Sequence, residues 1–491
     1  MASLRVRKDA WKLATWDPTI LWYAKAINEM RNRKVANPMS WRYQAAIHDY
    51  ALGADPLAQP GDVLPSQGEQ KQFWRQCQHF SWYFLPWHRM YLFCFERIVS
   101  ATIVQLGGPA DWALPYWNYS DANNPDARRL PPAFHAQSMP GGSQNPLLVA
   151  DRDEGNSGEL IGDANDVDIV GCLSELIYTA NLSGGDPGFG GPKTAFNHSR
   201  GSTGSLEATP HGNMHIAVGG WMGAFNTAGL DPIFWLHHSN IDRLWNVWRK
   251  RRSKNVNPPD SQWLKGVTFD FHDDAGIVSF TVDQVVDSTA APLQYSYQDE
   301  SDPLPAPLAA PTAEALRSLA ISSPSIPEMV GASQKSVTLT GAPAQAHIQV
   351  QSPVGPALAS AQRTTPRRTF LNFQNITGSG KARRYSVYVN LPAGSMPVDH
   401  PELYAGDLPM FGVAESSRAD ENHPGSGVEY TLEITSILAT LESSPQWNPA
   451  NLQVSFIPKP PAAGSVRALR AIASPAPDHE IQVGSVSLYY A

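Results

Sequence analysis

Two groups of histidines in the first half of the chain constrain it more than any other feature. The first group is His79-Phe-Ser-Trp-Tyr-Phe-Leu-Pro-Trp-His88, with His48 upstream. The second is Pro210-His211-Gly-Asn-Met-His215, followed later by Leu236-His237-His238. Neither group is accompanied by a cysteine quartet or a cage of carboxylates. Six imidazoles in two groups of three suit a pair of borderline-soft transition metals, with copper first among them.

The spacing of these histidines indicates how they converge. His211 and His215 are four residues apart, so a helix places both imidazoles on one face, one turn apart. Pro210 fits the first position of that helix. His79 and His88 are too far apart for one unbroken helix face, but two helix ends that meet at a bend near Pro86 would bring them together. A zinc hydrolase is the alternative, although one catalytic zinc takes three protein ligands and leaves three histidines unexplained.

The first 255 residues look mainly helical. Apolar residues recur at helical spacing in 19–33, in 71–104 with Pro86 as a break, and in 233–252. Between about 120 and 205 the chain is rich in Pro, Gly, Asn and Asp, which predicts long surface loops with short helices. A chain of 491 residues is long enough for two or three domains.

After Trp263 the pattern changes to the alternation that is typical of strands. The predicted strand segments are 267–286, 384–391, 428–437, 452–457 and 481–489. We therefore predict an α+β multidomain protein, in which a mainly helical domain precedes an antiparallel β-sandwich or barrel. The predicted divisions are the helical domain 1–255, a short β extension 256–300, a Pro/Ala/Ser-rich linker 301–335 and the β-domain 336–491.

Charge and cysteine usage limit the partners and the compartment. The net charge of −8 argues against a nucleic-acid partner, and the lack of an apolar run of 18 residues argues against a membrane span. Cys77, Cys94 and Cys172 are too few for a disulfide framework, and their odd number suits a reducing compartment. No secretory segment is visible at the N-terminus, so we expect a cytoplasmic protein.

Residues beside the histidines resemble those of a known family. Phe84-Leu-Pro-Trp-His88-Arg89-x-x-Leu92-x-x-x-Glu96 resembles the copper A signature of the tyrosinase and polyphenol oxidase family. Asp231-Pro-Ile-Phe-Trp-x-x-His238-x-x-x-Asp242 resembles its copper B signature. The resemblance implies two copper ions in a helical domain with a four-helix-bundle core. It places copper A on His48, His79 and His88, and copper B on His211, His215 and His238, so that His237 binds no metal.

The resemblance reaches beyond the histidines. Segments similar to plant polyphenol oxidases stand at 5–10, 114–118, 263–273, 295–297 and 384–390. In that family the paired tyrosines, here Tyr295 and Tyr297, pack against an N-terminal arginine, for which Arg7 is the candidate. A transit segment and the paired N-terminal cysteines of the plant proteins are missing, which indicates a bacterial relative with the plant type of architecture.

The resemblance implies an oxidase for small phenols. Such enzymes use O2 and two copper ions to oxidise o-diphenols to o-quinones, and many hydroxylate monophenols at the ortho position. O2 and phenols are then the partners, and a homo-oligomer is possible in this family. Two other activities remain open, an o-aminophenol oxidase and a haemocyanin-like O2 carrier. A single copper pair without a repeated unit argues against the carrier.

Three residues near copper B have candidate roles. In related enzymes a glutamate at the place of Glu207 orders a water that deprotonates the phenol; the alternative is a first-turn glutamate that the helix dipole favours. Efficient hydroxylators of the family often carry asparagine at the place of Gly212. Glycine offers no side-chain hydrogen bond there, which argues against strong monophenol hydroxylation unless Asn213 substitutes.

Two further residues and one domain have candidate roles as well. Cys77 stands two residues before His79, an order that resembles the thioether link of some relatives; the alternative is an inert buried thiol. Phe225 falls near the place of a bulky gate residue over copper, and the alternative is an ordinary core aromatic. In latent relatives the C-terminal domain covers the site with an inserted side chain, so removal of residues after about 300 should raise activity.

Overall fold

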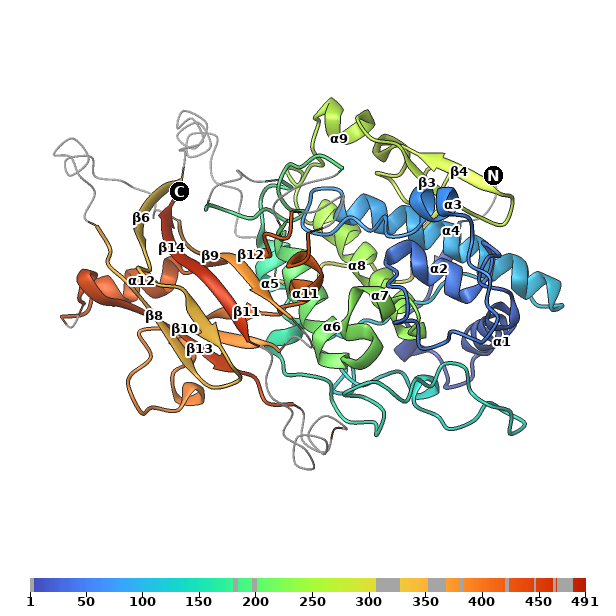
Figure 1. Cartoon of the computed structure of the whole chain (residues 1–491), viewed down its shortest axis with the longest axis horizontal. Helices are drawn as coiled ribbons and strands as arrows, with labels where there is room; N and C mark the ends of the chain where they lie inside the picture. Colours follow the sequence, from blue (N-terminus) through green and yellow to red (C-terminus); the bar gives the residue numbers. More distant parts are fainter. Residues whose placement is uncertain are drawn as a thin grey trace.

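The chain forms a helical part and a β-rich part that lie side by side (Figure 1). The computed structural model describes residues 4–179, 184–196, 201–305, 327–351, 368–379, 383–419, 424–445, 447–461, 465 and 480–491. The helical part precedes the β-rich part in sequence, so the predicted order of the two classes of structure is confirmed.

Four helices frame the helical part: α1 (Pro18–Asn32), α2 (Trp41–His48), α4 (Phe84–Gln105) and α8 (Pro232–Arg251). Aspartates cap two of them, because Asp17 accepts a hydrogen bond from the Thr19 amide and Asp231 accepts one from the Ile233 amide. Helix α4 is buried along most of its length and packs against α1 and α8, as expected of a central helix. The predicted helices in 19–33 and 233–252 are confirmed within one residue.

The predicted helical break at Pro86 was wrong. Helix α3 (Gln67–Phe73) ends well before α4 begins, and the segment 74–83 between them is not helical. Pro86 lies in the first turn of α4, where an amide has no helical partner and proline is therefore tolerated. His79 consequently lies on a loop and His88 on a helix.

Short elements complete the helical part. Among its described residues, the predicted loop region 120–205 contains short helical turns, including α5 (Val170–Ser174), and the two-residue strand β2 (Gly201–Ser202). Other short helices are Glu207–Gly212, α6 (Asn213–Val218), α7 (Phe225–Ala228) and α9 (Ser261–Lys265). Two small sheets pair β1 (Arg5–Arg7) with β5 (Tyr295–Tyr297), and β3 (Phe269–His272) with β4 (Ile277–Phe280). No helix in the described residues is long and apolar enough to cross a membrane.

Two sheets form the β-rich part. One is antiparallel in the order β11-β10-β13-β8, with the strands Tyr404–Leu408, Tyr385–Val389, Leu452–Pro458 and Ala344–Ile348. The other has the order β2-β12-β9-β14-β6, with the strands Gly201–Ser202, Val428–Glu433, Thr369–Gly378, Ile481–Tyr490 and Glu328–Ala332; β7 (Val337–Leu339) also pairs with β14. The sheets share one core, in which the rings of Phe373 and Phe456 are 5.7 Å apart.

Several predicted strands differ from those observed. The predicted strand 428–437 ends at Glu433, and α12 (Thr435–Glu442) follows it. Strand β9 was not predicted, because both of its faces are buried near its start and its sequence lacks alternation. Of the predicted linker, residues 306–326 lie outside the described residues, and its last part contains β6.

One strand of the second sheet comes from the helical part. Gly201 and Ser202 of β2 pair in parallel with Val428 and Glu429 of β12. The segment that leads to His211 is thereby hydrogen-bonded to the C-terminal sheet.

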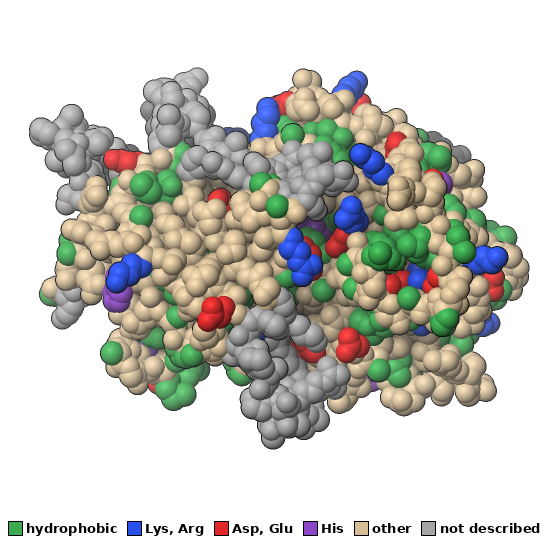
Figure 2. All heavy atoms as spheres, viewed as in Figure 1, with side chains coloured by type: hydrophobic (Ala, Val, Ile, Leu, Met, Phe, Trp, Pro, Cys, Tyr) green, Lys and Arg blue, Asp and Glu red, His purple; other side chains and the backbone are tan. Residues whose placement is uncertain are grey.

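The surface carries both signs of charge. On the face shown in Figure 2, Lys and Arg side chains are interspersed with Asp and Glu, and no broad basic patch forms among the described residues of that face. This agrees with the net charge of −8 and gives no support to a nucleic-acid partner on that face.

Candidate metal centre

Five helices and one loop bring the six predicted histidines together. His48 ends α2, His79 lies on the loop before α4, and His88 lies in α4. His211 and His215 lie on either side of the start of α6, and His238 lies in α8. None of the six is more than 5% exposed. Their nitrogen atoms form two groups, each within 4.8 Å: His48, His79 and His88 with Cys77, and His211, His215 and His238 with His237.

Backbone carbonyl groups fix the orientation of four of the rings. The Nδ1 atoms of His48, His88, His211 and His215 lie 2.9, 2.8, 3.0 and 2.7 Å from the carbonyl oxygens of Phe225, Phe84, Glu207 and Met222. Each Nδ1 therefore carries the proton and donates it, which leaves Nε2 as a free lone pair. The buried Nε2 atoms of His48 and His211 have no hydrogen-bond partner. Buried nitrogen atoms of this kind are suited to bind a metal.

Burial keeps the histidines neutral. It lowers the pKa of His48 to about 4. It also lowers the pKa of the other five well below the usual value, and neighbouring imidazoles lower that of His79 and His238 further. Neutral imidazole is the form that binds a metal, so the site needs no loss of protons at neutral pH.

The two groups adjoin each other. The rings of His88 and His238 stack with their centroids 4.3 Å apart, and those of His79 and His211 are 5.9 Å apart. The Nε2 atoms of His215 and His238 are 3.3 Å apart. Two metal ions bound to these groups would be neighbours, and donor sets made of imidazole favour copper over Ca²⁺ or Mg²⁺. The residues therefore fit a pair of copper ions.

His237 lies beside the second group and away from the first. Its ring stacks on His211 at 5.3 Å and on Tyr119 at 5.6 Å, whereas the ring of His238 also stacks on His88 of the first group. Neither ring nitrogen of His237 has a hydrogen-bond partner, and its ring is 4.8 Å from that of His215. The stacking supports the prediction that His238 and not His237 is the ligand, which stays a prediction.

The thiol of Cys77 faces the ring of His79. Its Sγ is 3.4 Å from Nδ1 and 3.8 Å from Nε2 of that ring, the two nitrogen atoms that flank Cε1. The same Sγ is 3.4 Å from Nε2 of His88. Burial raises the pKa of the Cys77 thiol, which keeps it protonated.

Glu207 has one free carboxylate oxygen at the site. Its Oε1 accepts a hydrogen bond of 2.8 Å from the Phe80 amide, and its buried Oε2 has no partner. Burial raises the pKa of Glu207 well above its usual value. The Asn213 amide donates to Oγ1 of Thr209 at 3.2 Å, and no hydrogen bond joins it to Glu207.

Two phenylalanine rings lie against the histidines. Phe225, the candidate gate residue, stacks on His79 at 4.1 Å. Phe411, from the segment between β11 and α11 (Val413–Ser416), stacks on His215 at 4.0 Å. It also lies 5.8 Å from His79 and 5.7 Å from His211. The sequence does not reveal this position of Phe411, because nothing in its local pattern distinguishes it from the other aromatic residues.

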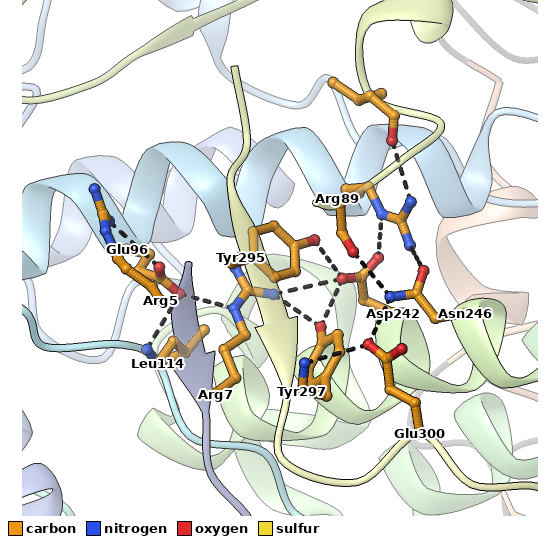
Figure 3. A network of polar contacts seen from close by, with 12 residues as sticks. Arg5, Arg7, Arg89, Glu96, Leu114, Asp242, Asn246, Tyr295, Tyr297 and Glu300 are labelled. Atoms are coloured by element: carbon orange, nitrogen blue, oxygen red, sulfur yellow. Dashed lines mark hydrogen bonds and ion pairs between the residues drawn. The ribbon is translucent and has the colours of Figure 1, made fainter. Parts of the chain in front are cut away.

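A buried network of charges joins the helices of the two groups (Figure 3). Arg89, next to His88, donates to Asp242, which lies one turn after His238, at 2.5 Å. The hydroxyls of Tyr295 and Tyr297 donate to the same carboxylate at 2.5 and 2.6 Å. Burial raises the pKa of Asp242, but the positive charges of Arg89 and Arg7 outweigh this effect and leave that pKa below its usual value.

The same network also binds the N-terminal strand β1 to the helical part. Arg7 donates to the hydroxyl of Tyr297 at 2.8 Å and to Glu96 at 2.8 Å, and its guanidinium lies 3.7 Å from the centre of the Tyr295 ring. The predicted packing of Arg7 against the paired tyrosines is confirmed (Figure 3).

A helical domain with two adjoining groups of buried histidines, followed by a β-rich domain, defines a type 3 dicopper protein. The model for the common central domain of tyrosinase matches residues 38–168 and 188–251, and a domain of unknown function (DUF7868) matches 326–491. Tyrosinase HcTyr1 of Hahella sp. (strain CCB-MM4) is 35% identical over 501 residues, which cover 99% of each chain. The chain belongs to the tyrosinase family, as a copper enzyme of the tyrosinase and catechol oxidase type.

Plant proteins share the fold as well. The chloroplastic polyphenol oxidase of Malus domestica is 29% identical over 296 residues, which span 57% of this chain and about half, 46%, of the plant protein. The solved structure of latent apple tyrosinase has a TM-score of 0.59 at 23% identity and covers 100% of this chain and 98% of its own. Latent aurone synthase, a polyphenol oxidase, has a TM-score of 0.61 at 22% identity, with coverages of 100% and 90%. These structures show that the helical and β-rich domains follow one another in the same way.

Proposed function

We propose that this enzyme oxidises small o-diphenols to o-quinones and hydroxylates monophenols more slowly. The observation that carries the proposal is the pair of adjoining groups of buried, neutral histidines. His48, His79 and His88 would hold one copper ion, and His211, His215 and His238 the other. Bound copper supplies the activation of O2 and accepts the electrons of the phenol. Two diphenols and one O2 then give two quinones and two waters.

The chain's own residues orient the substrate and handle its proton. The free Oε2 of Glu207 can accept the proton of an incoming phenol, directly or through one water. Phe225, stacked on His79, offers a flat apolar face to an aromatic ring. Neither Gly212 nor Asn213 gives Glu207 a side-chain hydrogen bond, which is our reason to expect slower turnover of monophenols.

The direct test compares substrates on the copper-loaded full chain. We expect O2 uptake with quinone formation from catechols, slower turnover of monophenols, and about two copper ions per chain by metal analysis. His88→Ala should lose copper and activity together. Reversible O2 binding without a quinone would show a carrier instead. Faster oxidation of aminophenols than of catechols would show an o-aminophenol oxidase, and zinc in place of copper would overturn the proposal.

We propose further that Sγ of Cys77 bonds to Cε1 of His79, because the thiol lies within 3.8 Å of both ring nitrogens that flank that carbon. The bond forms with loss of one hydrogen from the thiol and one from the ring, and O2, as the two-electron oxidant, takes up both and leaves as hydrogen peroxide. Intact-mass measurement should show a loss of two hydrogens after copper loading in air, which Cys77→Ala abolishes. An unchanged mass in the active enzyme would contradict the link.

We also propose that the C-terminal domain covers the site, with Phe411 as the inserted side chain. Its ring occupies the space beside His215 that a substrate ring would need. The proposed divisions of the chain are 1–255, 256–300, 301–335 and 336–491. We expect Phe411→Ala to raise the catechol oxidase activity of the full chain, and an unchanged activity would contradict the cover.

The compartment and the oligomeric state are proposals too. The three cysteines form no disulfide, which suits a reducing compartment and supports a cytoplasmic location. A homo-oligomer stays a prediction, which sedimentation of the purified full chain would test.

A further inference from the structure

Phe80 belongs to both domains. It directly follows His79, yet its ring is 6% exposed and packs in the hydrophobic core of the C-terminal domain. A Cβ atom built on Gly201 of β2 would lie 3.3 Å from this ring, and one built on Gly412, next to Phe411, would lie 3.0 Å from it. The ring is therefore enclosed by β2 and by the segment that carries Phe411. Each domain thus inserts a phenylalanine into the other.

The backbone of Phe80 is held in an unfavourable conformation. Its φ is +57°, in the left-handed region, which a bulky residue adopts only when its surroundings hold it there. The burial of the ring supplies that restraint. In this conformation the Phe80 amide donates its hydrogen bond of 2.8 Å to Oε1 of Glu207.

The backbone that leads to Glu207 also depends on the C-terminal domain. Gly204, three residues before Glu207, belongs to this backbone. The neighbouring Thr203 amide donates to the carbonyl oxygen of Glu429 in β12 at 3.3 Å, and β2 pairs with β12 just before it. The Phe80 amide and the backbone that leads to Glu207 therefore both lie on segments of the helical domain that the C-terminal domain anchors.

We infer that Phe80 is a positioning residue for Glu207, and that the C-terminal domain thereby forms a working part of the site as well as its cover. The inference rests on the proposed role of Glu207 as the acceptor of the phenol proton. Phe80 acts through its amide, which its ring keeps aimed at Oε1. Hydroxylation of monophenols needs this proton acceptor. It should therefore depend on the buried ring of Phe80 more than oxidation of catechols does.

The test compares two matched core substitutions in the full chain, each with and without Phe411→Ala to open the site. Phe80→Leu removes the ring that anchors the Phe80 backbone, and Phe373→Leu removes a ring from the same core, where it contacts Phe456. We expect Phe80→Leu to lower kcat for monophenols about tenfold and kcat for catechols less than about twofold. Phe373→Leu should change both substrates alike. Phe80→Met replaces Phe80→Leu if the latter does not fold.

Hydrogen exchange on the copper-free chain gives a readout that does not depend on activity. We expect Phe80→Leu to speed exchange in the segment 201–212, and Phe373→Leu to leave that segment unchanged. Equal loss on both substrates together with unchanged exchange would overturn the inference.

Glu207→Gln separates the inference from the function on which it rests. If this variant selectively loses monophenol hydroxylation while Phe80→Leu retains it, the inference fails and the role of Glu207 stands. If Glu207→Gln hydroxylates monophenols normally, the role of Glu207 fails, and the role of Phe80 in hydroxylation fails with it.

Discussion

Gly212 shows how the lack of one side chain lets the C-terminal segment approach the histidines. A Cβ atom built on it would lie 2.9 Å from Cγ of Pro409, two residues before Phe411. Its φ of −62° is ordinary, so the constraint is one of space and not of backbone strain. The absence of a side chain at this position has a structural reason that the sequence alone does not reveal.

We predict that Gly212→Ala raises the basal catechol oxidase activity of the full chain several-fold. The added methyl group must displace Pro409, which loosens the segment that holds Phe411 over His215. Gly171→Ala is the matched control, because a Cβ atom there would meet nothing within 4 Å. O2 uptake at saturating catechol measures the effect. Equal activity of the two variants would show that Pro409 yields without moving Phe411.

Because Oε2 of Glu207 is free to accept a proton, we predict that Glu207→Gln selectively loses monophenol hydroxylation. Glu207→Gln keeps the size of the side chain but removes the proton acceptor, so monophenol turnover should fall about 100-fold while catechol turnover changes less than about twofold. Steady-state kcat for a monophenol and the matching catechol, at equal copper content, checks this. A loss shared by both substrates would indicate that Glu207 only supports the fold.

Residues differ in how far the sequence predicts them. The six histidines lie in spaced motifs, and the structure brings all six together. Phe80, Pro409 and Phe411 carry no such mark, because their roles arise only where distant segments meet. Aromatic residues make up 10% of the chain, so the sequence does not distinguish the inserted ring of Phe411 from the many rings of the cores.

Among the elements, α4 and α8 matter most, because each carries a histidine and one partner of a buried ion pair. Arg89 and Asp242 join these helices, and both side chains are at most 2% exposed. The pair is well placed to fix the distance between His88 and His238, whose rings stack at 4.3 Å.

Asp242→Asn should therefore weaken both the fold and copper binding. It leaves Arg89 buried without its carboxylate and Arg7 with Glu96 alone, which should lower the free energy of unfolding by about 3–5 kcal/mol. Thermal unfolding and the copper retained after dialysis measure the two effects. Asp274→Asn is the control, since its pair with Arg97 is partly exposed, at 31% for each side chain, and should matter by less than about 1 kcal/mol. Similar losses in both variants would contradict a special role for Asp242.

The sequence predicted elements well where a single periodicity and end signals agree. Helices α1 and α8 begin with an aspartate cap followed by proline, and their ends were predicted within one residue. It failed at β9, which is buried on both faces, and at α12, whose start continues the apolar pattern of β12. In both places tertiary packing decides what the local pattern leaves open.

At the scale of the whole molecule, the buried histidines make the stability of the copper-free protein depend on pH. Burial lowers the pKa of His48 to about 4. As the pH falls, His48 is therefore protonated near pH 6.5 in the unfolded chain but only near pH 4 in the folded chain. The unfolded state thus binds more protons, and stability present above pH 6.5 is lost as the pH falls toward 4, by about 3 kcal/mol for His48 alone. We expect Tm of the copper-free protein to fall steadily from pH 7 to 4.5. A constant Tm over this range would contradict neutral, buried histidines.

The two domains meet through ion pairs in which the C-terminal domain supplies the cations. Arg384 pairs with Asp166 and lies 3.5 Å from Glu154, and Lys459 lies 3.0 Å from Asp166. A second set joins Arg368 to Asp186, and to Glu175 at 3.7 Å. The carboxylates of both sets come from the predicted loop region 120–205. This region therefore forms the surface on which the C-terminal domain rests.

We predict that Arg384→Met weakens this contact between the domains and raises the catechol oxidase activity of the full chain. Arg384 is 3% exposed, so its loss leaves Glu154 and Asp166 short of a buried cation and should weaken the contact between the domains by about 3–5 kcal/mol. Lys265→Met is the control, because Lys265 is 71% exposed and pairs within the helical domain. Activity and limited proteolysis of both variants check the effect. If Arg384→Met becomes easier to cleave between the domains but no more active, the cover must be held by Phe411 and its neighbours and not by these charges.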